Sequence, residues 1–298
     1  MIELREATQQ DRDAILALRK RCFPNEDVEK QEPSYWQWEF GNGRMFVAEE
    51  GGRAVAHLGF VPQTWRIDGE SYEGMLAVDA MTDPDHRRQG IFNRVAAFAR
   101  DALKTSVALS TAFQIRDAVL PPMEANGWRT VLRAPVLVKV NVGRAFARPI
   151  ELPELRGAIA EEFLTRVAHV QRSDAQLRWR FVDNPLYRID ATDDAYVVSR
   201  RTTLRGYDTL AITDIAWRPG KTRDARVLLA EVLARGRSEG VRLAAALVSL
   251  SHPAMPALVR SGFLPSPHRF RFLVNAFDER IRVSRARWAL TWADTDHL

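Results

Sequence analysis

The sequence predicts an α/β protein with two tandem domains, each a mixed, mostly antiparallel sheet flanked by helices. Three observations favour this fold class. Apolar stretches with the two-residue period of strands alternate with amphipathic stretches of helical period. Glycine-containing turns separate the middle strands. Several features recur in the same order in both halves of the 298 residues, a length that suits two domains of about 150 residues.

Strands and helices alternate in the first half. The turns at Glu50–Arg53 and Ile67–Glu70 have the glycine-containing chemistry of hairpins, so the strands beside them should form an antiparallel meander. The expected strands are Ile2–Arg5, Arg44–Glu49, Ala54–Val61, Thr64–Ile67, Met75–Thr82 and Ser106–Ser110. The expected helices are Gln10–Phe23, Ser34–Phe40 and Asn93–Leu103.

The two halves echo each other at three places. A Trp-x-Phe pattern precedes a strand-rich stretch, an Asp-x4-Pro pattern precedes an amphipathic helix, and a Gly-aromatic pair follows a short helix, where a C-cap needs positive φ. The paired segments are Tyr35–Asn42 with Leu177–Asn184, Val78–Pro84 with Thr213–Pro219, and Gly127-Trp128 with Gly262-Phe263. This order favours duplication over two convergent halves. We therefore expect domains at residues 1–145 and 146–298, joined near Asn141–Gly157, where prolines interrupt the pattern.

The composition is that of an ordinary globular protein. Hydrophobic residues make up 46% and charged residues 27% of the sequence, which excludes the disordered and fibrous classes. No stretch reaches the roughly 20 apolar residues of a bilayer span, and a cytoplasmic location is expected. The net charge of +5 favours an anionic ligand, either nucleic acid or a phosphorylated cofactor. Because no nucleic-acid-binding module is recognisable, the cofactor is the better interpretation.

The segment Met75–Leu103 predicts an anion site. It reads as an apolar strand, a short turn, the basic run Arg87-Arg88-Gln89-Gly90, and a long helix. The first N–H groups of such a helix lack partners within the helix and carry the positive end of its dipole. Gly90 has no Cβ to keep a phosphate away, and the two arginines add charged donors, so a pyrophosphate is the favoured ligand. The alternative is a solvated basic helix start without a ligand.

This segment resembles the central motif of the GCN5-related N-acetyltransferase (GNAT) superfamily, which is a strand, then Arg/Gln-x-x-Gly-x-Gly/Ala, then a helix. Arg87 and Gly90 match, whereas Phe92 replaces the last small residue. The variant resembles bacterial acyltransferases built from tandem domains, over Met1–Val140 and more weakly over Glu161–Val274. The resemblance implies that acetyl-CoA or another acyl-CoA binds as co-substrate. It assigns cofactor binding to Met81, Thr82, Arg87, Arg88, Gln89, Gly90, Ile91 and Phe92.

The resemblance implies N-acylation, with the primary amine of an amino sugar, an antibiotic or an amino acid derivative as the expected acceptor. The amine must lose a proton before it attacks, and the thioester oxygen needs a donor, which the family takes from a strand-end N–H, here near Met81. Asp79 is the first candidate base, because it shares a strand face with Met81 and burial would raise its pKa. Glu73 is the next candidate. Asp79 has a counterpart in the second half, Asp214, which favours the alternative that both make structural hydrogen bonds.

The general acid of the family is missing. Many members protonate the leaving thiolate with a tyrosine that lies four residues before the glycine of the closing Gly-aromatic pair, and Met123 occupies that position here. Either water or another side chain replaces the tyrosine, or the chain binds acyl-CoA without turnover, as a regulatory protein. A third interpretation is acylation of a protein lysine or N-terminus. Tyr35, Trp36 and Trp38 either pack in the core or line an acceptor pocket.

The second half lacks the Arg-x-x-Gly spacing. One CoA should therefore bind per chain, in the first half, while the second half is structural or helps to form the acceptor pocket; Gly220–Thr222 is the alternative anion site. Histidines His57, His86 and His252 have no partners at metal-ligand spacing, so no metal is expected. The expected partner is a small-molecule amine, with neither nucleic acid nor membrane, and the sequence does not decide between a monomer and a homodimer.

Overall fold

The computed structural model describes residues 1–25, 28–114, 117–143 and 155–295. The chain divides into two compact units. The first unit is made of Met1–Thr64, Tyr72–Leu132 and Phe272–Val283, and the second of Trp65–Ser71, Arg133–Arg271 and Ser284–Leu298. The predicted boundary between residues 145 and 146, and most of the predicted linker, lie outside the described residues.

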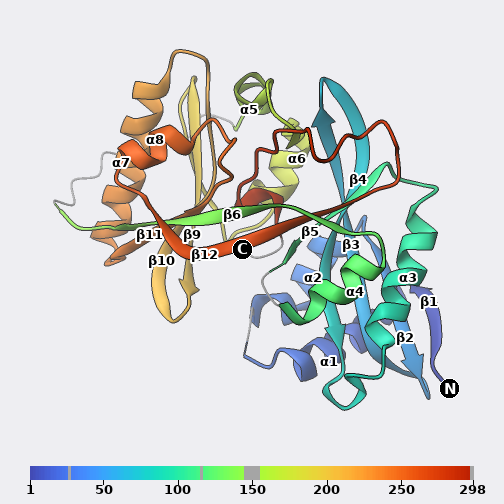
Figure 1. Cartoon of the computed structure of the whole chain (residues 1–298). Coiled ribbons are helices and arrows are strands. Elements are labelled where there is room, and N and C mark those ends of the chain that lie inside the picture. The colour runs from blue at the N-terminus through green and yellow to red at the C-terminus, as the bar shows by residue number, and fades with distance from the viewer. Residues whose placement is uncertain (26–27, 115–116, 144–154, 296–298) are drawn as a thin grey trace. The chain divides into compact units, whose positions relative to one another are not determined.

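The first unit is a mixed sheet flanked by helices, in agreement with the predicted fold class (Figure 1). Its strands follow the order β1-β2-β3-β4-β5-β12, in which β1, β2 and β3 pair antiparallel and β4 pairs parallel with β5. The strands that begin in the first half of the sequence are β1 (Glu3–Ala7), β2 (Arg44–Glu50), β3 (Arg53–Ile67), β4 (Glu70–Thr82), β5 (Leu109–Gln114) and β6 (Arg129–Val140). The helices are α1 (Arg12–Cys22), α2 (Pro33–Phe40), α3 (Ile91–Leu103) and α4 (Leu120–Ala125), with 3-10 turns η1 (Gln9–Asp11), η2 (Val28–Gln31), η3 (Pro84–His86) and η4 (Asp117–Val119).

Both predicted hairpin turns are confirmed. Gly51 and Gly52 have positive φ between β2 and β3, as do Asp68 and Gly69 between β3 and β4, which is the conformation that two-residue hairpin turns need. The two strands expected on either side of Pro62 are instead the single strand β3, because the fixed φ of proline is compatible with extended backbone.

The predicted strand Ser106–Ser110 also begins later than expected, at Leu109. The N–H groups of Ser106 and Val107 both donate to the Leu103 carbonyl and so close the end of α3.

Helix α3 packs its apolar face against the sheet of the first unit. Its buried side chains are Ile91, Val95, Ala96, Ala99 and Leu103, which recur at helical spacing. They share one core cluster with Phe46 of β2 and Phe60 of β3. This packing fixes where the helix begins, directly after the loop that follows β4.

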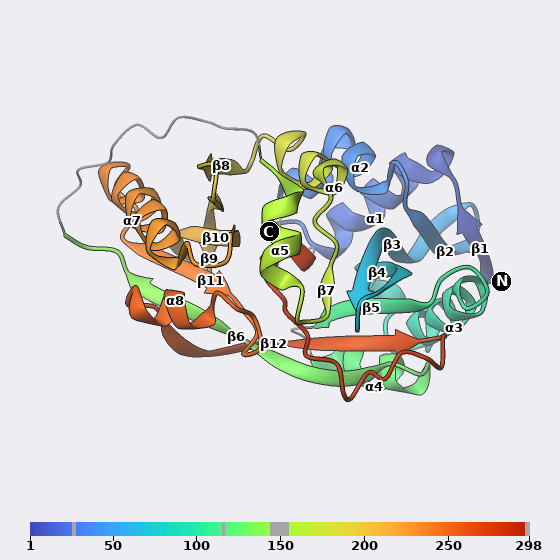
Figure 2. The same ribbon diagram turned by 90° about the horizontal axis from the view of Figure 1, so that it is seen from above.

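The second unit has the same kind of architecture, with α7 and α8 beside its strands (Figure 2). Its strand order is β12-β6-β11-β10-β9-β8, in which β10 pairs parallel with β11, and the β6–β11, β9–β10 and β8–β9 pairs are antiparallel. The strands are β7 (His169–Val170), which pairs with the end of β3, β8 (Arg188–Ala191), β9 (Ala195–Leu204), β10 (Tyr207–Trp217), β11 (Leu243–Leu247) and β12 (Leu264–Ala276). The helical elements are α5 (Gly157–Leu164), α6 (Asp174–Leu177), the π-helical turn η5 (Arg178–Val182), α7 (Thr222–Ser238), α8 (Met255–Arg260) and the 3-10 turn η6 (Trp292–Asp294).

The last strand of each sequence half extends into the unit of the other half. β6 follows α4, yet from Arg133 onward it belongs to the second unit, where it pairs with β11. β12 follows α8, and from Phe272 onward it belongs to the first unit, next to β5. The exchange makes the units discontinuous in sequence, which no local pattern could have predicted.

The predicted Gly-aromatic helix ends are confirmed in both units. Gly127 and Gly262 have φ of 90° and 88°. The N–H of Trp128 returns to the Met123 carbonyl at 3.2 Å, and that of Phe263 to the Leu258 carbonyl at 3.1 Å. The two helices therefore end with the same hydrogen-bond pattern.

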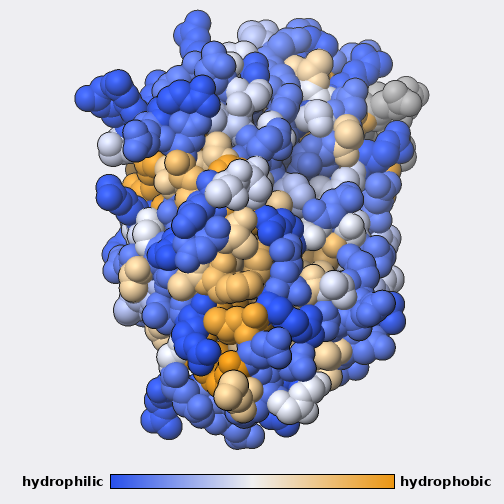
Figure 3. All heavy atoms as spheres, turned by 90° about the vertical axis from the view of Figure 1, so that its right-hand side faces the viewer, coloured by the Kyte–Doolittle hydropathy of each residue, from blue (hydrophilic) through white to orange (hydrophobic). Residues whose placement is uncertain are grey.

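One face of the molecule shows apolar side chains surrounded by hydrophilic ones (Figure 3). Exposed large apolar residues of the described chain come from several elements, such as Phe98 of α3 and Val227 of α7.

Among the helices that the structure describes, none has the length and hydropathy of a membrane span.

Candidate functional site

β4 and β5 diverge within the first unit. Their parallel pairing runs from Gly74 with Leu109 to Ala77 with Ala112 and then stops. β4 continues to Thr82, five residues that have no partner in the described part of β5. Diverging strands leave backbone N–H and C=O groups available to an extended ligand. Two of the predicted cofactor residues, Met81 and Thr82, lie in this stretch without a partner in β5.

The loop after β4 presents several backbone donors close together. Arg88 and Gly90 both have positive φ, at 62° and 71°, so the chain turns tightly before α3 begins at Ile91. Within the described residues, no hydrogen bond uses the N–H groups of Arg88, Gln89 or Gly90. The next three N–H groups, from Ile91 onward, are in the first turn of α3 and have no acceptor within the helix. A run of donors at the positive end of a helix dipole fits a pyrophosphate.

Gly90 is required by the backbone conformation of this loop. It is the N-cap of α3 in the left-handed region, where a side chain would be strained. A Cβ at this position would meet no atom within 4 Å. Space above the glycine is therefore open to a ligand, and the glycine also lets the loop form.

The basic side chains of the loop are exposed. Arg87 Nε donates to the Thr82 carbonyl at 3.2 Å, and Arg88 makes no ion pair among the described residues. Gln89 Nε2 donates to the Asp85 carbonyl at 3.2 Å. The Thr82 carbonyl also accepts from Cys22 Sγ at 3.3 Å, so this oxygen is used within the chain. Arg88 thus offers the freest positive charge of the loop.

A buried acid, Asp83, anchors the start of the loop. It accepts from the N–H of Asp85 at 3.1 Å and from Arg21 Nε at 2.8 Å. His86 is hydrogen-bonded to it at 3.4 Å and to Glu50 at 3.2 Å. His86 therefore has a structural place in the turn.

Asp79 lies at a kink in the part of β4 that has no partner in β5. Its φ is 49°, which is rare for a residue other than glycine in a strand. Its side chain is 7% exposed and forms a short ion pair with Arg19 of α1. Burial alone would raise the pKa of Asp79, but the charges of Arg19 and Lys30 outweigh burial and lower it. The expected rise in pKa is therefore wrong, and these contacts favour a structural role over that of a base.

Asp79 belongs to a buried group of charges that the sequence reasoning missed. Lys30 Nζ lies 3.9 Å from Asp79 Oδ1 and 3.5 Å from Glu39 Oε1. Lys30 and Glu39 are each 5% exposed, and Arg19 is 4% exposed. Two cations and two carboxylates thus compensate each other beside the β4 kink, as buried charges must.

His57 of β3 is the fifth polar residue at this kink. It is fully buried, and its Nδ1 lies 2.9 Å from the Asp79 carbonyl oxygen. A carbonyl can only accept, so Nδ1 carries the proton. Burial lowers the pKa of His57, which keeps the ring neutral. Nε2 is then an acceptor, and it has no partner among the described residues.

The structure does not bring Glu73 near Met81. Glu73 is exposed and accepts from Thr64 Oγ1 at 3.4 Å. It precedes Met81 by eight residues of β4, or about 27 Å of extended strand. Its position therefore gives no support to a role as base.

The aromatic residues of α2 are mainly core. Tyr35 is 9% exposed and Trp36 is 2% exposed, while Trp38 is half-buried and packs edge-on against Tyr35 with ring centroids 5.0 Å apart. Met123, at the position of the missing acid, is buried in the core cluster of the first unit. Of these residues, Trp38 is the most exposed.

The second unit contains a divergence of the same kind. β10 and β11 pair from Thr209 with Leu243 to Ile212 with Ala246, and β10 continues for five residues, to Trp217, without a partner in β11. Asp214 is the second of these five residues, as Asp79 is in β4. It forms an ion pair with Arg172 at 3.0 Å, and both side chains are at most 4% exposed. The two aspartates therefore make equivalent structural contacts.

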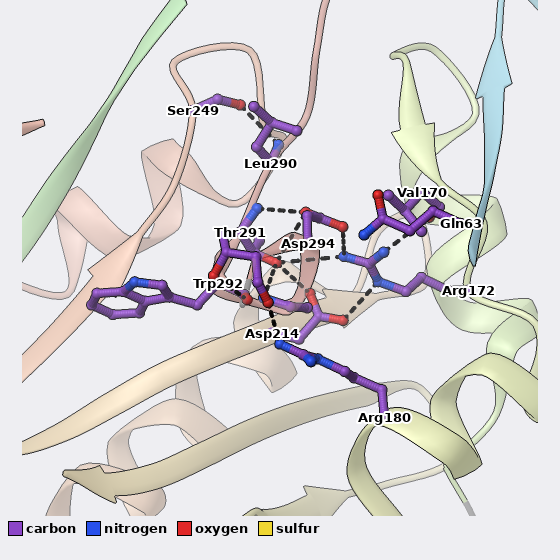
Figure 4. A network of polar contacts seen from close by, with 12 residues as sticks. Gln63, Val170, Arg172, Arg180, Asp214, Ser249, Leu290, Thr291, Trp292 and Asp294 are labelled. Atoms are coloured by element: carbon purple, nitrogen blue, oxygen red, sulfur yellow. Dashed lines mark hydrogen bonds and ion pairs between the residues drawn. The ribbon is translucent and has the colours of Figure 1, made fainter. Parts of the chain in front are cut away.

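In the second unit, however, the C-terminal segment Trp288–Thr295 fills the divergence (Figure 4). Thr291 forms an antiparallel bridge with Val248, just after β11, and its Oγ1 donates to Asp214 Oδ1 at 3.2 Å. The Ser249 N–H donates to the Leu290 carbonyl at 3.0 Å. Every residue of this segment is buried. The segment thus contacts β10 and the residues just after β11, beyond the paired part of these strands. In the first unit, the corresponding part of β4 is the stretch without a partner in β5.

Arg172 links the C-terminal segment to β10. Its Nη2 lies 2.7 Å from Asp294 Oδ1, in addition to its pair with Asp214. Burial raises the pKa of Asp294, although Arg172 opposes this. Tyr196 donates its hydroxyl to Asp214 Oδ2 at 3.1 Å. The network therefore closes this region with the chain's own side chains.

The turn after β10 also differs from the loop after β4. Lys221 pairs with Asp194 at 2.7 Å, and Arg218 forms a short ion pair with Glu162. Thr222 Oγ1 accepts from Trp217 Nε1 at 3.2 Å. These contacts neutralise the cations of the turn, so the alternative anion site at Gly220–Thr222 has little charge to offer.

No group of three or more potential metal ligands occurs in the described part of the chain. Comparison with known proteins identifies residues 3–116 with the family model described as an acetyltransferase (GNAT) domain. No curated protein matches the sequence.

Several solved structures share the fold at low sequence identity. A GCN5-related N-acetyltransferase from Anabaena variabilis superposes with a TM-score of 0.67 at 13% identity, over 93% of this chain and 73% of the other. A probable N-acyltransferase from Enterococcus faecalis gives 0.64 at 14%, over 93% and 73%. A putative acetyltransferase from Pyrococcus horikoshii gives 0.61 at 12%, over 98% and 95%.

Proposed function

We propose that this chain, whose residues 3–116 match the family model of a GNAT acetyltransferase domain, is an acyl-CoA-dependent N-acyltransferase of the GNAT superfamily. The observation that carries this proposal is the open divergence of β4 and β5 beside a loop of free backbone donors. The loop from Arg87 to Phe92 would bind the pyrophosphate of CoA through its N–H groups and Arg88. Met81 would contact the pantetheine arm.

The proposed reaction is direct attack of a primary amine on the thioester, with acetyl-CoA as the simplest donor. A small amine such as an amino sugar, an antibiotic or an amino acid derivative is the proposed acceptor. Most of the acceleration would come from proximity and from a backbone donor to the thioester oxygen near Met81. Asp79, with its lowered pKa and buried ion pair, would support this site through structure. Water would then take the amine proton, and the thiolate of CoA that leaves when the C–S bond breaks would be protonated by water.

We propose that one CoA binds per chain, in the first unit. Two observations support this stoichiometry. The equivalent divergence in the second unit is filled by Trp288–Thr295, and the cations of the turn after β10 are paired with acids. The second unit would then be structural or contribute to the acceptor pocket.

A second candidate function is acyl-CoA binding without catalysis. Met123 supports it, because a buried thioether cannot protonate the leaving thiolate. Titration calorimetry with CoA and with acetyl-CoA tests binding and its stoichiometry. Thiol release from acetyl-CoA on a panel of amines then separates an enzyme from a binding protein. No heat with either cofactor would reject both functions, and full turnover by Asp79→Asn across pH would exclude Asp79 as the base.

A further inference from the structure

His57 has an unusual position for a residue outside the cofactor loop. It is completely buried in β3, in edge-on contact with Phe40 at 5.8 Å between ring centroids, and its ring nitrogen Nδ1 donates to the Asp79 carbonyl. The residue that it contacts is the kinked residue of β4, with φ of 49°. A buried histidine that binds a strained backbone carbonyl fixes the orientation of that peptide group.

The orientation of this peptide has a direct chemical consequence. The bond between Asp79 and Ala80 is trans, so its C=O and N–H point in opposite directions. When His57 Nδ1 binds the Asp79 carbonyl, the N–H of Ala80 must point away from His57. Ala80 is exposed and lies in the part of β4 that has no partner in β5. The N–H of Ala80 is therefore next to Met81, where the proposed reaction needs a donor to the thioester oxygen.

We propose that His57 is a positioning residue that aims the Ala80 N–H at the thioester carbonyl oxygen of the bound acyl-CoA. This inference rests on the proposed function. Arg19 also forms a buried ion pair with the carboxylate of Asp79. The backbone carbonyl and the side chain of Asp79 are therefore both held in place. His57 does not touch the reactants and exchanges no proton in this role.

The test compares two substitutions of similar size. His57→Gln keeps a side-chain N–H that can reach the Asp79 carbonyl, whereas His57→Met removes the donor. Infrared difference spectra with acetyl-CoA labelled at the carbonyl carbon report the hydrogen bond to the thioester oxygen and need no knowledge of the acceptor. We expect the carbonyl band of bound acetyl-CoA to move toward its free position in His57→Met and to stay nearer the wild-type position in His57→Gln.

The controls separate this role from general stability. His252 is a fully buried neutral histidine in the second unit, so His252→Met should lower the melting temperature like His57→Met but leave the band unchanged. Affinity for free CoA should be the same in all variants, while kcat with any accepted amine should fall about tenfold or more in His57→Met alone. An unshifted band in His57→Met overturns the inference. Failure of the wild-type chain to bind acetyl-CoA overturns the proposed function itself.

The unmodified chain provides a second measurement if His57→Met does not fold. Nitrogen-15 NMR of the histidine rings should show His57 with its proton on Nδ1 and a bare Nε2. Acetyl-CoA should perturb the Nδ1 resonance, because it binds the same peptide group from the other side. A proton on Nε2 would remove the donor toward Asp79 and contradict the inference.

Discussion

The two places where a parallel strand pair separates have the same arrangement of strands but differ in what lies between those strands. In each unit a parallel pair separates after four residue pairs, and the longer strand continues for five residues with an aspartate in second place. Asp79 pairs with Arg19 and Asp214 with Arg172. Between β10 and β11, however, the chain inserts Trp288–Thr295, whereas between β4 and β5 the described residues contribute no such segment.

The same strand framework is therefore filled by the chain in one unit and, as we propose, used to bind a ligand in the other. A buried Asp–Arg pair lies beside the divergence in both units, so the pair does not distinguish the proposed cofactor site from the filled divergence. Among the described residues, the loop after β4 has free N–H groups and an Arg88 without an ion pair, whereas the turn after β10 has paired cations. We infer that binding depends on the loop and on an open divergence together, as the following substitutions can test.

The largest effects are expected at the two buried arginines. Arg172→Met leaves Asp214 and Asp294 without their shared cation and should lower the free energy of unfolding by about 3–5 kcal/mol. Arg19→Met should destabilise the first unit to a similar extent. Of the two variants, only Arg172→Met should also increase hydrogen exchange in Trp288–Thr295, since Arg172 pairs with Asp294 of that segment. Unchanged protection there would mean that the segment does not depend on the ion pair.

The second effect is a pH dependence. Burial lowers the pKa of His252 to about 4, and the charge of Arg172 adds to this effect. In the unfolded chain the same side chain has a pKa of about 6.5. Between these values the unfolded state binds more protons, so the free energy of unfolding falls as the pH falls, by about 3 kcal/mol for this group. Urea denaturation of wild type and His252→Gln from about pH 7 to about pH 4.5 isolates the contribution. A pH dependence identical in both proteins would contradict the buried neutral state.

Local sequence patterns predicted the elements and the loop but not the buried partners. The hairpin turns at Gly51 and Gly69 and the helix end at Gly127 were recognisable because each needs positive φ within a few residues. The burial of Arg19 had a weaker signal in the sequence, which is that Arg19 continues the buried face of α1 after Ile15 and Leu18. A charged residue on an apolar face indicates a buried partner but does not identify it.

The remaining features depend on contacts that are distant in sequence. The pKa of Asp79 was predicted in the wrong direction because Arg19 lies 60 residues away. The filling of the second divergence joins Asp214 to Thr291, which are 77 residues apart. The exchange of β6 and β12 also requires the complete fold. In each case several residues could serve as the contact partner, and a single sequence does not indicate which of them the fold brings close.

The third prediction concerns two matched glycines. Gly90 and Gly220 have φ of 71° and 84°, both precede a long helix, and a Cβ at either meets no atom within 4 Å. Gly90→Glu and Gly220→Glu should therefore cost similar stability, roughly 1–2 kcal/mol. CoA at about a hundredfold excess over Kd stabilises a protein by about 2.7 kcal/mol. That stabilisation should disappear in Gly90→Glu and persist in Gly220→Glu, as measured by thermal unfolding.

The opposite result for the glycines would move the site to the second unit. Loss of the CoA effect in both variants would indicate that strain or added charge acts globally, which Gly90→Asn can check. Asparagine tolerates the left-handed conformation and adds no charge. It should keep most of the CoA stabilisation, because the backbone donors of the loop remain.

The smallest effect is expected from the loop cations. Arg88 is exposed and unpaired among the described residues, whereas Lys221, at the corresponding turn, pairs with Asp194 at 2.7 Å. Arg88→Met should weaken CoA binding by about 1 kcal/mol, or roughly fivefold in Kd, and the loss should shrink at high salt. Arg88→Lys should recover part of it, and Lys221→Met should change nothing. If titration calorimetry gives equal affinities for Arg88→Met and wild type at low salt, the backbone N–H groups alone bind the pyrophosphate.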